Sequence, residues 1–164
     1  MTERREKNAI FADMKTVRFQ VKRAEAYEEV KKTSSYSGKK TQGDDGAYER
    51  IFVKDADEEM LGRFFDEACN GLTDLVKPFI AATGAGNDFD VTLEMPSTFD
   101  EKLQPSMQRS MFSFVVLSIV ASWYDFVKDD KTEVTAKDAL GMLEDIRGKL
   151  YWRKPVKRVV RNRS

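Results

Sequence analysis

Two stretches of the chain alternate strictly between apolar and polar residues, which is the pattern of a β strand that buries one face. Residues 17–22 read VRFQVK, and residues 89–95 read FDVTLEM before Pro96 interrupts the alternation. The sequence therefore predicts two short strands. Although they lie far apart in the chain, they can pair with each other in one sheet.

Other stretches repeat apolar residues at the spacing of a helix. The apolar positions of residues 60–80 recur at steps of one, three and four, and Pro78 should kink or end this helix because it lacks a backbone donor. A shorter helix is predicted in RAEAYEEVKK, residues 23–32. A last helix starts near Thr135 and has a predicted buried stripe of Leu140, Leu143, Ile146 and Leu150.

Polar segments separate these elements. Residues 33–46, TSSYSGKKTQGDDG, are rich in Ser and Gly and predict a mobile loop. Residues 83–88, TGAGND, predict a helix C-cap followed by a turn. The pairs Asp55–Glu58 and Thr98–Glu101 resemble capping boxes, in which two side chains satisfy free backbone N–H groups at the start of a helix.

The most apolar stretch, SMFSFVVLSIVASWYDF, occupies residues 110–126. Between Arg109 and Asp125 lie 15 uncharged residues, roughly 22 Å of helix, which is too short for a bilayer core of about 30 Å. The stretch is apolar on nearly all sides, so it must be surrounded by other elements. Two arrangements remain open, a central core helix or a core helix with one face in a subunit interface. The residues predicted to fill this role are Phe112, Val116, Ile119 and Trp123.

The amino-acid composition excludes several kinds of catalytic and metal site. The chain of 164 residues has no His and a single Cys, so nucleophile–His arrangements and Cys/His zinc sites cannot form within one chain. Cys69 falls on an apolar helix face and is predicted to be an inert core residue. Asp66, Glu67 and Asp74 are candidates for acid–base or Mg²⁺ chemistry. However, Asp66 and Asp74 are predicted to lie on the outer face of an amphipathic helix, where charged side chains are usually solvated. We expect no catalytic, cofactor or metal site and no enzymatic activity.

Charge is distributed unevenly although the formal net charge is zero. Residues 41–152 carry 11 basic and 22 acidic residues, a net charge of −11, whereas residues 153–164, RKPVKRVVRNRS, carry 6 basic residues and no acid. A basic end on an acidic body favours contact with an acidic partner, with folding back or solvation as the alternative. The predicted partner-binding residues are Arg153, Lys154, Lys157, Arg158, Arg161 and Arg163.

These elements predict a mainly α (α+β) domain, with three to four helices around a long apolar central helix and two or three short strands. Residues 15–152 form a single globular domain. Residues 1–14 are expected to be a disordered or non-native extension, since the first strand begins directly after Met14. Residues 153–164 are expected to form a basic C-terminal arm.

The order of these segments resembles that of known groups of proteins. The run from GAYERIF through DADEEMLGRFFDEACNGLTDLVKPFI, the strand excursion, the apolar helix and MLEDIRGKLYWRKPVKR is similar to small prophage proteins of Bacteroides-type bacteria. It also resembles the head–tail connector (neck) proteins of tailed bacteriophages, small helical subunits that form rings between portal and tail. The resemblance implies a location in the bacterial host cytoplasm or in a virion.

Three classes of function follow. The first is a non-enzymatic structural or assembly subunit that contacts itself or other virion proteins, such as portal and tail completion proteins. The second is a DNA-associated accessory protein, because a basic arm can neutralise several phosphates. The third is an enzyme that uses the carboxylates named above. The first class is favoured, with at most weak contact to DNA and none to a membrane.

Overall fold

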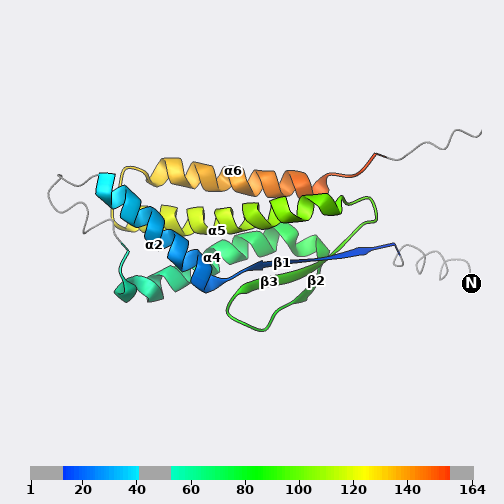
Figure 1. Ribbon diagram of the computed structural model, residues 1–164, viewed down its shortest axis with the longest axis horizontal. Helices are drawn as coiled ribbons and strands as arrows, with labels where there is room; N and C mark the ends of the chain where they lie inside the picture. The colour runs from blue at the N-terminus through cyan, green and yellow to red at the C-terminus, as the bar shows by residue number, and fades with distance from the viewer. Residues whose placement is uncertain (1–12, 41–52, 156–164) are drawn as a thin grey trace, which may run out of the picture.

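The computed structural model describes residues 13–40 and 53–155, in which α5 lies between α6 and a small sheet (Figure 1). The elements follow in the order β1 (Lys15–Val21), α2 (Arg23–Lys40), η1 (Asp55–Asp57), α4 (Glu58–Val76), η2 (Lys77–Phe79), β2 (Ile80–Thr83), β3 (Phe89–Met95), η3 (Glu101–Leu103), α5 (Gln104–Phe126) and α6 (Thr132–Tyr151). The predicted class, a mainly helical α+β domain around a long apolar helix, is confirmed.

The sheet has the order β1–β3–β2 and is antiparallel, with Phe19 opposite Val91. This confirms the predicted pairing of the two alternating stretches. A third strand agrees with the predicted two or three, but its position, β2 at Ile80–Thr83, was not predicted. Instead of capping a helix, residues 84–88 form the turn between β2 and β3, where the N–H of Gly84 donates to the carbonyl of Asp90 at 2.9 Å. A Cβ on Gly84 would come within 2.7 Å of the Asp90 side chain, so this turn requires glycine.

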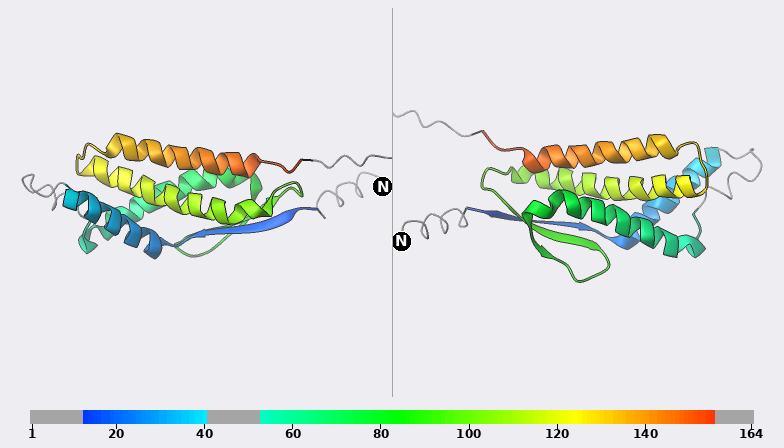
Figure 2. Two further views of the ribbon diagram at one scale, coloured as in Figure 1. Left: turned by 45° about the horizontal axis from the view of Figure 1, so that its top comes forward. Right: turned by 180° about the vertical axis from the view of Figure 1, so that it is seen from behind.

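Helix α5 is covered by its own domain, with α6, α4, α2 and β1 packed around it (Figure 2). Val116, Ile119 and Trp123 are buried in the core, and Phe112 is partly buried against it. Val116, Ile119 and Trp123 therefore lie within the core of their own domain. None of the helices in residues 13–40 and 53–155 is both long and apolar enough to cross a membrane.

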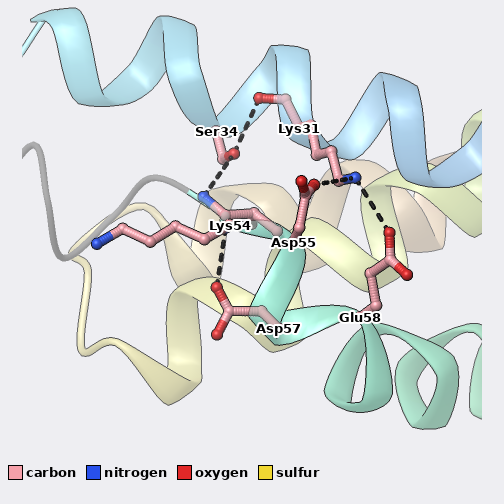
Figure 3. A network of polar contacts seen from close by, with 7 residues as sticks. Lys31, Ser34, Lys54, Asp55, Asp57 and Glu58 are labelled. Carbon is pink, nitrogen blue, oxygen red and sulfur yellow. Dashed lines mark hydrogen bonds and ion pairs between the residues drawn. The ribbon is translucent and has the colours of Figure 1, made fainter.

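Helix α2 continues through residues 33–40, so the prediction of a loop there was wrong; residues 41–46 of that prediction lie outside the described residues. Ser34 is buried, donates to the carbonyl of Lys31 at 3.0 Å and accepts from the N–H of Val53 at 3.2 Å (Figure 3). In a sequence, serine suggests a loop because its side chain can form hydrogen bonds with backbone groups in place of the helical ones. Here the same capacity joins α2 to the segment that precedes α4.

The two predicted capping boxes do not form. Asp57 rather than Glu58 reaches back to a backbone N–H, that of Lys54, at 2.9 Å. Asp55 and Glu58 both accept from the ammonium of Lys31, at 2.9 and 3.3 Å, and so attach α2 to the start of α4 (Figure 3). At η3 the cap is Asp100, whose side chain accepts from the N–H of Lys102, in place of Thr98 and Glu101.

The predicted buried stripe of α6 was wrong at Leu140, which is 61% exposed. Ile146 and Leu150 are fully buried, Leu143 is partly buried, and Ala139 takes the place of Leu140 in the core. At about 100° per residue, Ala139 points in nearly the same direction as Ile146 and Leu150, whereas Leu140 points well to one side. The helix also begins at Thr132, before the predicted start.

Candidate partner-binding site

The end of α6 leaves two aromatic side chains uncovered. Tyr151 is 52% and Trp152 is 46% exposed. The Tyr151 ring packs edge-on against Phe79, with 5.5 Å between the ring centroids. Trp and Tyr are enriched in protein interfaces, where one residue can supply much of the binding energy. This end of α6 is therefore a candidate contact surface.

A shallow cleft of about 300 Å³ lies beside Trp152. Its apolar walls come from Trp152 and Leu103, and Gly148 forms part of its surface. A Cβ on Gly148 would meet nothing within 4 Å, so the packing of this domain does not require glycine there. The cleft combines apolar walls with a polar rim made by Asp100, Asp145 and Lys149.

The charges on this rim are largely neutralised by one another. Asp145 accepts a hydrogen bond from the ammonium of Lys149 at 2.6 Å and one from the hydroxyl of Ser110 at 2.6 Å. These two contacts, the Lys149 bond first, hold the pKa of the Asp145 carboxyl below its usual range. Lys149 also donates to Ser106 at 2.5 Å. Lys149 is therefore committed to neighbours of its own chain.

The first residues of the predicted basic arm are held in place. The N–H of Lys154 donates to the carbonyl of Thr98 at 2.8 Å. The guanidinium of Arg153 donates to the carbonyls of Leu150 and Trp152, at 2.8 and 2.9 Å. Arg153 thus caps the C-terminus of α6, where a cation also interacts favourably with the helix dipole. The remaining predicted arm residues, Lys157, Arg158, Arg161 and Arg163, lie outside the described residues.

Among the described residues, the structure does not bring the two predicted sets together. Trp123 lies near the end of α5 that is opposite the arm, with its ring 5.7 Å from that of Phe126. Phe112 lies elsewhere again, in a shallow cleft lined by Gln20, Gln108 and Arg109. Sequence reasoning missed the cleft beside Trp152. One indication of it is present in the sequence, the aromatic pair Tyr151 and Trp152 directly before the basic residues 153–164.

The residues considered for chemistry are partly buried, ion-paired or exposed on the surface of α4. Burial, and to a smaller extent the nearby charge of Asp66, raises the pKa of the Cys69 thiol to about 12, so the reactive thiolate is suppressed at neutral pH. Asp66 is paired with Arg23 at 2.7 Å, and Glu67 and Asp74 are exposed on α4. Within residues 13–40 and 53–155, no three acidic or Cys side chains are grouped to hold a metal ion.

Comparison with known proteins returned no match: no family model fits this chain, and no curated protein or solved structure is similar to it.

Proposed function

We propose that this protein is a non-enzymatic assembly subunit, of the class to which phage head–tail connector proteins belong. It binds a neighbouring protein through the end that carries Tyr151, Trp152 and the basic arm. The observation that carries this proposal is the exposed aromatic pair beside a cleft. An uncovered Trp that borders an apolar pocket is the arrangement found at the centre of protein interfaces.

The charges around the cleft favour a protein partner over nucleic acid. Asp100 and Asp145 place two carboxylates on the rim, and the ammonium of Lys149 is already bound to Asp145. A phosphate backbone that followed the arm to its root would be repelled by the carboxylate of Asp100, and it would gain little from Lys149, whose charge is already paired with Asp145. A polypeptide carries both signs of charge and can avoid that repulsion.

The second candidate is a DNA-associated accessory protein. It is favoured by the six basic residues and the absence of acids in residues 153–164. In that case Trp152 would stack on a base and the arm would follow phosphates. The capping role of Arg153, which faces two carbonyls of its own chain, reduces the number of cations that this mode can use.

The test is whether the chain enters particles. Particles released after induction of a prophage that carries this gene are purified by density gradient, and their proteins are quantified by mass spectrometry. We expect several copies of the chain per particle. The variant Trp152→Ala should be depleted from particles by at least about tenfold, the loss expected for an interface hot spot.

The matched control is Leu140→Ala, since Leu140 is also a largely exposed apolar residue of α6 but lies away from the cleft. This variant should enter particles at the wild-type level. A chain that stays wholly in the particle-free lysate would contradict the proposed function. Equal incorporation of Trp152→Ala and wild type would contradict the site.

A further inference from the structure

The molecule has two opposite ends that differ in chemistry. Helices α5 and α6 run antiparallel along its length, so the α5–α6 turn lies at one end and the root of the arm at the other (Figures 1 and 2). The 20 residues of α6 separate these ends by about 30 Å. The aromatic pair and the arm occupy one end, and the other end carries a second uncovered surface.

This second surface, the turn end, has two exposed apolar side chains. Phe126, the last residue of α5, is 55% exposed, and Val134 in the first turn of α6 is 65% exposed. No described element covers either of them. The Phe126 ring packs on one side against Trp123, which fixes its position while the rest of the ring faces solvent.

The same turn also carries several acidic residues. They line a depression of about 410 Å³ formed by Asp125, Lys128, Asp129, Asp130, Thr132 and Glu133. Four carboxylates and one ammonium give this lining a charge of −4 + 1 = −3. Asp129 is paired with Lys131 at 3.3 Å, whereas Asp125, Asp130 and Glu133 are exposed and form no ion pair with a described residue. The turn end thus presents two exposed apolar side chains and, in the same turn, three carboxylates that no described residue neutralises.

The arm has the complementary composition. Residues 153–164 hold six basic residues and no acid, and three valines are interspersed among them, Val156, Val159 and Val160. The valines are apolar like Phe126 and Val134, and the basic residues are opposite in charge to the carboxylates of the same turn. Complementary charge on two surfaces both guides association and disfavours other partners.

The arm cannot easily reach the turn end of its own molecule. Residues 152–155 lead away from α6, beyond the end opposite the turn (Figure 1). The nine residues that follow Pro155 span at most about 32 Å when fully extended. They would have to reverse direction and pass the whole length of α6, about 30 Å, before meeting the turn end. A second molecule placed end to end requires no reversal.

We propose that the basic arm of one copy binds the turn end of the next copy, so that copies join head to tail; this contact rests on the proposed assembly function. Such a contact uses two different surfaces of the chain and therefore continues until a ring closes. The ends of two helices offer an area of only about 200 Å², well below the roughly 800 Å² per partner of a stable interface. The arm must supply most of the contact.

Two variants of the purified full-length chain test this contact by sedimentation velocity. The arm variant carries Lys157→Gln, Arg158→Gln, Arg161→Gln and Arg163→Gln. The turn variant carries Asp125→Asn, Asp130→Asn and Glu133→Gln. We expect the wild type to associate as concentration rises, and each variant alone to associate at least about tenfold more weakly. A control variant with Glu59→Gln, Glu67→Gln and Asp74→Asn, which removes three exposed acids of α4, should behave as the wild type.

Mixing the two variants in equal amounts gives the decisive result. The arm variant keeps an intact turn end and the turn variant keeps an intact arm, so one productive contact remains and the mixture should contain a dimer of one of each. A mixture that stays monomeric would overturn the head-to-tail contact, as would a wild type that is monomeric at every concentration. If particle incorporation depends on Trp152 while the mixture stays monomeric, only the head-to-tail contact is wrong.

Discussion

Leu150 and Leu140 lie on the same helix and allow one chemical change to be compared in two environments. Leu150 is fully buried, whereas Leu140 is 61% exposed. Replacing Leu150 with Ala removes about three buried carbon groups, worth about 2.4 kcal/mol in transfer free energy, and leaves a cavity that raises the loss to about 3–5 kcal/mol. Replacing Leu140 with Ala removes groups that are mostly in water and slightly improves helix propensity. Its cost should be below about 1 kcal/mol.

Urea unfolding followed by circular dichroism measures both changes at low protein concentration. With a slope of about 2 kcal/mol per molar urea, Leu150→Ala should lower the unfolding midpoint by about 1.5–2.5 M. Leu140→Ala should lower it by less than about 0.5 M on the same slope. Equal shifts for the two variants would refute the rotation of α6 described above and would favour the stripe predicted from the sequence, which buries both leucines.

Three further outcomes are expected. Because the pKa of Cys69 is raised to about 12, iodoacetamide should alkylate it far more slowly in the native chain than in urea at the same pH, as mass spectrometry would show. The bond from Lys149 lowers the pKa of the Asp145 carboxyl in the folded chain. The stability that this carboxylate contributes is therefore present above its unfolded pKa and is lost as pH falls through the folded pKa. Acid titration of Asp145→Asn should show a smaller loss of folding stability below about pH 4 than the wild type does. Replacing Gln108 with Ala removes both side-chain bonds to the backbone of Gln20 and should speed hydrogen exchange at the Gln20 amide, which NMR measures; unchanged exchange would contradict this.

The elements that the sequence predicts well are those whose pattern extends over many residues. The alternation in β1 and β3 and the long apolar face of α4 are of this kind, and Pro78 lies two residues after the end of α4. By contrast, β2 has only four residues. Such a strand is too short to show an alternation, and its pairing with β3 decides its structure.

Other features depend on contacts between distant residues. The helical conformation around Ser34 accompanies a bond to Val53, which no local pattern reveals. The burial of Leu140 depends on which face of α6 packs against α5. Rotating α6 about its axis by one residue position is enough to move Leu140 out of the core. The cleft beside Trp152 joins residues of η3 and α6, so only the aromatic pair itself was visible in the sequence.

Duplex DNA titrations at two salt concentrations decide whether the arm end binds protein rather than DNA. The intact chain is compared with a chain that lacks residues 153–164. If six basic residues neutralised phosphates, the logarithmic salt slope would be about −5, and a fourfold rise in salt would weaken binding about 10³-fold. We expect no measurable binding at physiological salt, with or without the arm. Tight binding that shows this salt dependence and is lost with the arm would contradict this expectation.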